Sequence, residues 1–292
     1  MTAAIEVTNL TKRYGSITAL DDVTVSIQQD SITGILGRNG AGKTVLMSVI
    51  TAQEAPTQGT VRMFGQSPWE NASVLSGTCF IRDNQRYPDE YRLAQLLRVG
   101  PLFYENWDEA LAERIVETFE IPGGRSIRKL SRGQLSAVGL LMGLASRAPI
   151  TFFDEPYLGL DITARTLFYD LLLEDYAAHP RTVVVSTHLI EEMEQLLERV
   201  VILHHGRVRE NADIEDLRQR AVRLSGRTAD LDRVVGGYEV LRRSTLGTLS
   251  TALVTSTDSI RGDAAAAGVD VEPASIHELV AAYGMQTEEV AR

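Results

Sequence analysis

Apolar and polar residues alternate in two different ways along the first 210 residues. Residues 5–10 and 23–27 alternate between apolar and polar, with one break at Thr8 and Asn9, which is typical of half-buried strands, and residues 11–15 between them are predicted to form a turn. Three other runs are predicted to be buried strands: residues 31–36, 150–153 and 182–186. Helical spacing occurs between these runs, first over residues 45–50. Strands that alternate with helices predict an α/β fold with a mostly parallel sheet.

A helical segment is predicted from about residue 88 to residue 145. Pro101 and a polar stretch after it should divide this segment into separate helices, with Asn106 or Asp108 as the cap of the next one. Residues 135–145 are apolar on nearly every side of a helix, so we expect that helix to be buried. The segment therefore predicts a helical subdomain within a larger α/β domain.

The character of the sequence changes after residue 210. A polar helix is followed by short predicted strands, which are separated by turns that contain Gly, Asp or Ser. A last amphipathic helix is predicted from Ile276 to Tyr283, and we expect its apolar face to cover the sheet formed by these strands. We therefore predict a main domain over residues 1–210 and a small α+β domain over residues 211–292.

Composition narrows the class of protein. With 29 Lys and Arg against 39 Asp and Glu, the formal net charge is −10, which argues against nucleic acid or anionic lipid as a partner. The single cysteine, Cys79, excludes an internal disulfide and a cysteine-built zinc site, and it fits a reducing cytoplasm. The longest apolar stretch has about half of the roughly 20 residues that a spanning helix needs, and the N-terminus lacks a secretory pattern. We expect the chain not to cross a membrane by itself.

Residues 37–44 match the phosphate-binding loop pattern G-x-x-x-x-G-K-[ST]. The glycines allow the backbone to turn tightly and to aim its N–H groups at an anion. Lys43 supplies a charge for the β- and γ-phosphates, and the Thr44 hydroxyl can bind Mg²⁺. A buried strand precedes the loop and a helix follows it, as the pattern requires. The predicted nucleotide-binding residues are Gly37, Arg38, Asn39, Gly40, Ala41, Gly42, Lys43 and Thr44.

Further candidate residues stand at the ends of predicted strands. Asp154 and Glu155 close one buried strand, where Asp154 can hold Mg²⁺ and Glu155 can act as general base toward the attacking water. Two buried acids at a strand end are costly unless a cation or a proton requires them. His188 follows the next buried strand, and Tyr14 offers an aromatic surface on which an adenine ring could stack. Taken alone, His188 would be a structural residue and Tyr14 would pack in a turn.

Together these motifs resemble the nucleotide-binding subunit of an ATP-binding cassette (ABC) transporter over residues 1 to about 210. The segment 130–134, Leu-Ser-Arg-Gly-Gln, is similar to the family signature L-S-G-G-Q, with Arg132 in place of the first glycine. The resemblance assigns Asp154 and Glu155 to the second nucleotide motif and His188 to the switch histidine. It implies an antiparallel β part before the phosphate loop and a helical signature subdomain. It also implies roles in nucleotide binding for Tyr14, Ser131, Arg132, Gly133, Gln134 and Asp161.

The resemblance further implies a head-to-tail dimer with two ATP molecules between its subunits. Each phosphate loop would then face the signature segment of a second copy or of a related ATPase subunit, and a separate membrane permease would be the other partner. A glutamine that senses Mg²⁺ is expected after the strand at 78–81. Arg82 occupies this place by direct counting, and the nearest glutamine is Gln85, which we predict to take the role.

The sequence therefore predicts an ATPase with ATP and Mg²⁺ as cofactors, held at the inner face of the cell membrane through its permease. The run from Phe152 to Asp161 most resembles bacterial single-domain subunits, and this resemblance slightly favours export over uptake. Two alternatives are a soluble ABC ATPase that acts in assembly and a regulatory nucleotide sensor without sustained turnover. The presence of Glu155 argues against the sensor, because loss of the general base usually marks an inactive site.

Overall fold

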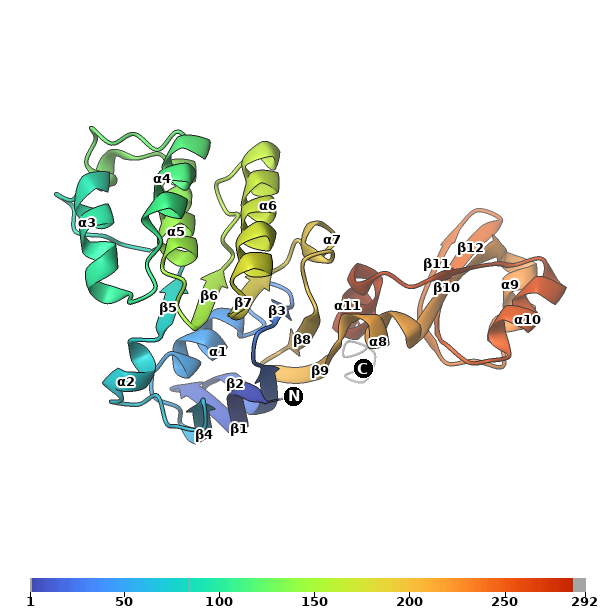
Figure 1. Ribbon diagram of the computed structural model, residues 1–292. Helices are drawn as coiled ribbons and strands as arrows, with labels where there is room; N and C mark the ends of the chain where they lie inside the picture. Colours follow the sequence, from blue (N-terminus) through green and yellow to red (C-terminus); the bar gives the residue numbers. More distant parts are fainter. Residues whose placement is uncertain (1, 84, 286–292) are drawn as a thin grey trace.

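A six-stranded sheet forms the centre of the larger part of the molecule (Figure 1). The computed structural model describes residues 2–83 and 85–285. The strand order is β5-β6-β7-β3-β8-β9, and every pair is parallel except β8 and β9, which form a hairpin. The mostly parallel sheet is thus confirmed. Its strands are β3 (Ile32–Leu36), β5 (Thr78–Ile81), β6 (Ile150–Asp154), β7 (Thr182–Thr187), β8 (Arg199–His204) and β9 (Arg207–Asp213).

A three-stranded antiparallel sheet precedes and flanks this centre, in the order β2-β1-β4. It consists of β1 (Ala3–Tyr14), β2 (Ile17–Gln28) and β4 (Gln58–Met63). The turn predicted over residues 11–15 is wrong, because β1 continues to Tyr14, which pairs with Ile17. The chain reverses at Gly15, whose φ of 58° lies in the left-handed region that suits glycine.

The two faces of the central sheet belong to two different hydrophobic clusters. Phe153 packs with α5 (Arg132–Ala145) and α6 (Ile162–Ala178), whereas Phe152 packs with α1 (Lys43–Ile50) and the antiparallel sheet. Successive residues of a strand point to opposite faces, so an unbroken apolar run is what this two-sided burial requires. Short helices α2 (Ala72–Leu75) and α7 (Ile190–Met193) complete this part of the chain.

The helical subdomain contains α3 (Leu93–Phe103), α4 (Glu109–Thr118), a 3₁₀ turn η1 (Ile127–Lys129) and α5. Asp108 is the cap of α4, because its carboxylate accepts the backbone N–H of Leu111 at 2.7 Å. The break expected at Pro101 is wrong, since Pro101 lies inside α3. Proline has no backbone N–H to donate within the helix. Because α3 ends only two residues later, this missing hydrogen bond affects little more than the last turn of the helix. Gly143 allows α5 to lie close to the sheet, where an added Cβ would be 2.3 Å from the ring of Phe153.

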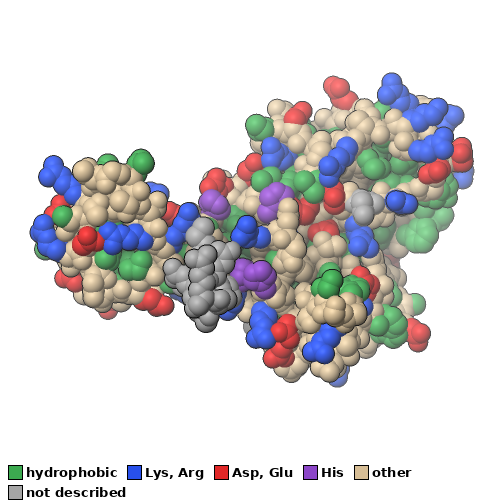
Figure 2. Space-filling model, turned by 180° about the vertical axis from the view of Figure 1, so that it is seen from behind, with side chains coloured by type: hydrophobic (Ala, Val, Ile, Leu, Met, Phe, Trp, Pro, Cys, Tyr) green, Lys and Arg blue, Asp and Glu red, His purple; other side chains and the backbone are tan. Residues whose placement is uncertain are grey.

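A separate small lobe follows the central sheet, and it has a hydrophobic core of its own (Figure 1). Its antiparallel sheet has the order β11-β12-β10-β13. Figure 2 shows this lobe set apart from the larger body, with Lys and Arg side chains on its surface. The elements that follow β9, of which β10 to β13 form this lobe, are α8 (Ile214–Gln219), β10 (Ala221–Arg227), α9 (Thr228–Val235), β11 (Val240–Leu246), β12 (Leu249–Thr255), α10 (Ile260–Ala267), β13 (Asp270–Pro273) and α11 (Ile276–Met285).

The last helix does not chiefly cover the small sheet. Ile276, Leu279 and Ala282 of α11 are buried in the cluster that also contains the Phe153 face of the central sheet. The helix contacts α7, α8 and β8, and it also contacts β11, so the expectation that it would cover its own sheet is only partly right. The predicted boundary after residue 210 falls inside β9, which pairs with β8 as far as Asp213. The described segment with its own separate core runs from β10 to β13.

Candidate functional site

The phosphate-binding loop connects β3 to α1, and its glycines occupy positions that other residues would strain. Gly42 is the N-terminal cap of α1 with a φ of 105°, and an added Cβ would lie 2.8 Å from the carbonyl oxygen of Ala19. Gly40 also has a positive φ, of 81°. The N-terminus of α1 therefore directs its unpaired N–H groups and its partial positive charge toward the loop.

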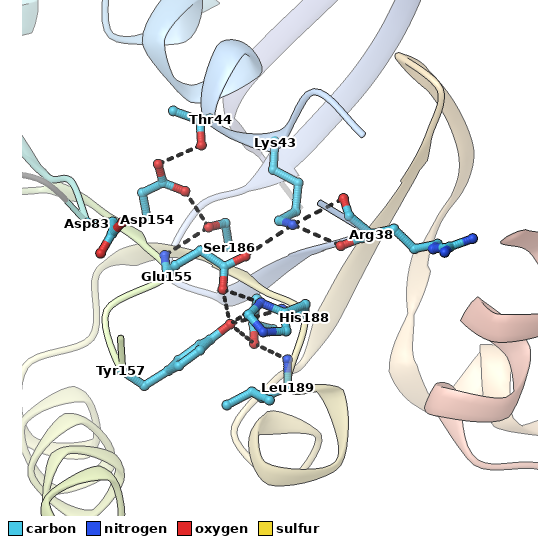
Figure 3. A network of polar contacts seen from close by, with 12 residues as sticks. Arg38, Lys43, Thr44, Asp83, Asp154, Glu155, Tyr157, Ser186, His188 and Leu189 are labelled. Atoms are coloured by element: carbon cyan, nitrogen blue, oxygen red, sulfur yellow. Dashed lines mark hydrogen bonds and ion pairs between the residues drawn. The ribbon is translucent and has the colours of Figure 1, made fainter. Parts of the chain in front are cut away.

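Lys43 is almost fully buried beside this loop, at 6% exposure. Its ammonium donates to the carbonyl oxygen of Gly37 at 2.8 Å and lies 3.1 Å from Glu155 Oε1 (Figure 3). Glu155 Oε1 is buried and, among the described residues, has this ion pair but no further hydrogen bond. A buried ion pair beside the phosphate loop suits a site that binds a charged ligand.

Asp154 lies at the end of β6 with two hydroxyl groups directed at it. Thr44 donates to Oδ2 at 2.7 Å, and Ser186, at the paired position on β7, donates to Oδ1 at 2.6 Å. Burial raises the pKa of Asp154 above its ordinary value, although these two hydrogen bonds oppose the rise. A cation next to Asp154 would offset the cost of burying its charged carboxylate. Hydroxyl and carboxylate oxygens are the ligands that Mg²⁺ prefers.

Glu155 has a φ of 50°, which is uncommon for a residue other than glycine. Its backbone N–H donates to the Ser186 hydroxyl at 3.0 Å, which holds the residue in this conformation. The carboxylate lies 2.7 Å from His188 Nδ1 and accepts a hydrogen bond from the Tyr157 hydroxyl. The structure therefore brings the two predicted catalytic residues, Glu155 and His188, into direct contact.

A cavity of about 500 Å³ opens onto these residues. Arg82 and Asp83 lie on its wall, whereas Gln85 does not. Gln85 follows a short turn in which its N–H donates to the Arg82 carbonyl at 3.1 Å. Gln85 therefore lies outside the described wall of this cavity, and the role that we predicted for it stays a prediction. The lining residues are Ala19, Asn39, Gly40, Ala41, Gly42, Lys43, Thr44, Val45, Arg82, Asp83, Asp154, Glu155, Leu158 and His188.

The signature segment lies at the N-terminus of α5, outside the cavity wall of its own chain. Ser131 accepts the N–H of Gln134 at 3.2 Å, and the Gln134 side chain accepts the N–H of Ser131 at 3.1 Å, which forms a capping box. Arg132 pairs with Asp83 at 3.1 Å. Gly133 packs against Gly159, where an added Cβ would lie 2.6 Å from the Gly159 carbonyl oxygen.

Four other predicted residues also lie off the cavity wall, namely Gly37, Arg38, Asp161 and Tyr14. Asp161 caps α6 by accepting the N–H of Ala164 at 2.8 Å. The Tyr14 ring is 42% exposed at the end of β1, with the ammonium of Lys12 4.9 Å from its centre. Its hydroxyl donates a hydrogen bond to Glu54. Burial is the main cause that raises the pKa of Tyr14 to about 12, and this hydrogen bond is the second cause.

The sequence prediction missed Ser186 and Tyr157. Ser186 is a polar residue at the end of an apolar strand, and that pattern could have identified it as a neighbour of the acids at the end of β6. Tyr157 had no comparable signal, because its contacts depend on how β6 and β7 pair. Within the described residues, no group of three or more His, Cys, Asp or Glu is arranged to hold a metal. No described helix is long and apolar enough to span a membrane.

The chain is similar to known ATP-binding proteins of transporters. The family profile described as ABC transporter matches residues 20–158. The ABC transporter ATP-binding protein YtrB of Bacillus subtilis is 25% identical over 220 residues, with 75% of each chain covered. The bacitracin transport ATP-binding protein BcrA of Enterococcus faecalis is 29% identical over 233 residues, with 75% of this chain and 72% of that protein covered.

Solved structures have the same fold. A structure described as the ATP-binding subunit of an ABC transporter superposes with a TM-score of 0.66 at 26% identity, covering 74% of this chain and 92% of that one. A dimeric structure of MJ0796, a bacterial ABC transporter cassette, gives a TM-score of 0.64 at 23% identity, with 72% and 98% covered.

Proposed function

We propose that this chain works as a dimer attached to a membrane permease. The chain belongs to the ATP-binding subunits of ABC transporters and hydrolyses ATP to energise transport. Two copies, or one copy and a related subunit, bind head to tail with ATP between them. Each phosphate loop then faces the signature segment of the partner. The pair is attached to a separate permease at the inner face of the membrane.

The position of the signature segment is the observation that carries the head-to-tail arrangement. In the described part of the chain, the wall of the nucleotide cavity includes none of Ser131, Arg132, Gly133 or Gln134. Yet the capping box leaves the first turn of α5 with exposed N–H groups and a partial positive charge, which suit an anion. A partner chain is the natural source of the phosphate that this helix end would meet. The MJ0796 cassette, which has the same fold, is dimeric, and this supports a dimer of the present chain.

The residues of the site fit Mg-ATP. The phosphate loop would hold the phosphates, with Lys43 beside the β- and γ-phosphates, and Thr44 and Asp154 would hold Mg²⁺. When bound, Mg²⁺ neutralises charge that develops on the phosphates. Glu155 would take a proton from the attacking water, and His188 would hold a γ-phosphate oxygen. Both side chains line the cavity and contact each other, which supports these roles.

Attachment to a permease is tested by isolation from membranes. We expect the intact chain to be recovered from detergent-solubilised membranes of its own organism in a stoichiometric complex with one integral membrane protein. We also propose export as the direction of transport, because the run from Phe152 to Asp161 resembles subunits for which export is favoured. The same complex, reconstituted in vesicles with the ATPase on the outside, should then move substrate inward on addition of ATP. Movement of substrate out of the vesicles would show that the complex works in uptake and not in export. An active ATPase found in no membrane complex would favour the soluble assembly factor instead.

We also propose a revised division of the chain, in which residues 222–273 form a module that ATP binding does not require. The ends of this module lie together, because the N–H of Ala274 donates to the carbonyl of Ala221 at 3.3 Å. Replacing residues 222–273 by a short Gly-Ser linker should leave the affinity for Mg-ATP within about tenfold, or 1.4 kcal/mol, of the intact chain. Calorimetry on the soluble shortened chain measures this.

The control for this excision is a chain that ends at Arg209. That chain loses the end of β9 together with α8 and α11, which pack on the main core. It should therefore unfold at a clearly lower temperature than the chain that lacks only the module. Loss of ATP binding in a folded chain without residues 222–273 would mean that the small lobe completes the nucleotide site.

A further inference from the structure

A second cavity adjoins the nucleotide site and has a volume of about 290 Å³. The start of the phosphate loop, the residues after β7 and the last helix, α11, form its wall, and His188 lines both cavities. Its apolar part consists of Ile190 on α7 and of Val280 and Ala281 on α11. Another face of α11 is buried in the main core, so the helix holds these two side chains in place beside the phosphate loop.

The polar side chains on this wall are those of Arg38, at the start of the phosphate loop, His188 and His277. The side chain of Arg38 points away from Lys43 (Figure 3), and within the described residues its guanidinium makes no ion pair or hydrogen bond. His277 lies 2.9 Å from Glu191, which is not on the wall. In the part of the chain that the structure describes, the wall therefore carries an unpaired positive charge and no acidic side chain. Such a site suits an apolar group that is next to a carboxylate.

An apolar side chain next to a carboxylate protrudes from the start of α6. Ile162 is 74% exposed, and it follows Asp161, which is also exposed. The turn that leads to these two residues lies against the signature segment, where a Cβ on Gly133 would be 2.6 Å from the carbonyl oxygen of Gly159. The position of Ile162 is therefore fixed relative to the signature segment.

Two-fold symmetry brings the protruding residue and the second cavity together. If each phosphate loop faces the signature segment of the partner, the region between these two elements in one chain faces the same region of the other. The turn before α6 belongs to this region, because Leu158 lines the nucleotide cavity and Gly159 contacts the signature segment. His188 belongs to it as well, and the two cavities share His188. The start of α6 in the partner subunit is thus placed next to the second cavity.

We propose that α11 is part of the interface between two copies of this chain, in which Ile162 of the partner subunit packs against Val280 and Ala281 in the second cavity. Asp161 of the partner subunit then lies near Arg38 and pairs with its free charge. This inference rests on the head-to-tail dimer proposed above. It goes beyond that dimer because it gives the C-terminal helix a direct contact with the partner, and a two-fold dimer contains this contact twice.

The first test is Ile162→Lys in the full chain that also carries Glu155→Gln, a change that is expected to keep ATP bound. Sedimentation velocity with ATP and Mg²⁺ should show that the dissociation constant of the dimer rises at least about tenfold, because two apolar contacts are lost and a lysine is placed next to each Arg38. Ile162 is exposed and lysine is a good helix former, so the variant should fold normally. ATP binding by the monomer, measured by calorimetry, should stay the same.

Leu102→Lys in the same background is the matched control. Leu102 is an apolar residue of α3 that is 80% exposed and lies on the wall of neither cavity, so its replacement should leave the dimer unchanged. On the other side of the contact, Ala281→Trp should fill the second cavity and weaken the dimer as well. Ile162→Lys should then add little to Ala281→Trp, because both changes remove the same contact.

Cross-linking tests the contact itself. One chain would carry Ile162→Cys, and a second chain of different mass would carry His277→Cys, each together with Glu155→Gln. The side chain of His277 is 50% exposed and the natural Cys79 is buried, so the introduced cysteines are the ones that react. A short bifunctional maleimide should join the two chains of different mass when ATP is present, whereas Leu102→Cys in place of Ile162→Cys should give no such product.

An unchanged dissociation constant for Ile162→Lys would overturn the inference. So would the absence of the product between positions 162 and 277 in a sample that is dimeric with ATP. Failure of the head-to-tail dimer gives a different result, because the chain with Glu155→Gln would then stay monomeric with ATP, or would form dimers in which cysteines at positions 39 and 132 are not joined.

Discussion

Glu155→Gln is expected to lower kcat for ATP hydrolysis by roughly 10²–10⁴-fold while ATP binding is kept, since that is the usual contribution of a general base. The amide has the size of the carboxylate but does not accept a proton from water. The backbone bond from Glu155 to Ser186 does not depend on the side chain, so the strained turn should remain. Single-turnover kinetics and nucleotide binding measured on the same sample separate the two effects.

Glu174→Gln is the control for the loss of one negative charge. Glu174 lies on the surface, where its carboxylate binds Arg114 at 2.6 Å, and its replacement should leave kcat unchanged. Turnover of Glu155→Gln near the normal rate would show that Glu155 is not the base. If the role is correct, the unhydrolysed ATP should also hold two copies together, and this can be followed by size-exclusion chromatography with and without ATP.

Local sequence patterns were sufficient to predict the phosphate loop, the acids that end β6 and the histidine after β7. In each case the residues are neighbours in the chain or stand at the end of a strand. Parallel strands bring such ends together at one edge of the sheet. The capping box of α5 is equally local, because Ser131 and Gln134 are three residues apart. These features required no knowledge of long-range packing.

Other features depended on contacts between distant segments. Ser186 meets Asp154 only because β6 and β7 pair in one particular register, and Tyr157 then meets Thr187 and His188 for the same reason. The amphipathic pattern of α11 indicated that it covers something, but not that most of its apolar face would pack on the main core. The Gln85 prediction depended on how a loop is placed, and periodicity carries no information about that. The structure places Arg82 and Asp83 on the cavity wall and leaves the predicted role of Gln85 a prediction.

Arg132 shows how the two kinds of feature combine. Its place in the signature could be predicted from the sequence, whereas its ion pair with Asp83 on the cavity wall could not. This pair joins the signature end of α5 to the nucleotide cavity of the same chain. A head-to-tail partner would approach this region, so the exposed side chains here should report on dimer formation.

Ser131→Arg is expected to lower ATP turnover about 10²–10³-fold, the cost of losing a donor to a developing phosphate charge, although the chain's own phosphate loop is intact. The larger side chain would also fill the space in which the partner's γ-phosphate must lie. ATP binding to a single chain should therefore be nearly unchanged, as measured by calorimetry at a concentration that keeps the protein monomeric. Ser73→Arg places the same charge on an exposed serine of α2 and should leave turnover unchanged. Mixing Ser131→Arg with Lys43→Ala chains should restore part of the activity, because the mixed dimer has one undamaged site.

Cross-linking decides the case in which mixing restores nothing. Asn39 and Arg132 are both exposed, and the natural Cys79 is buried, so cysteines introduced at the first two positions can be labelled selectively. One chain would carry Asn39→Cys with Glu155→Gln, and the other Arg132→Cys with Glu155→Gln. A short bifunctional maleimide should join the two chains when ATP is present and much less without it, whereas Ser73→Cys in place of Arg132→Cys should give no product. Joining with ATP would mean that the two sites are strictly coupled within a composite dimer. If no joined product forms with ATP while both chains bind it, the signature segment serves no partner's phosphate and the head-to-tail proposal fails.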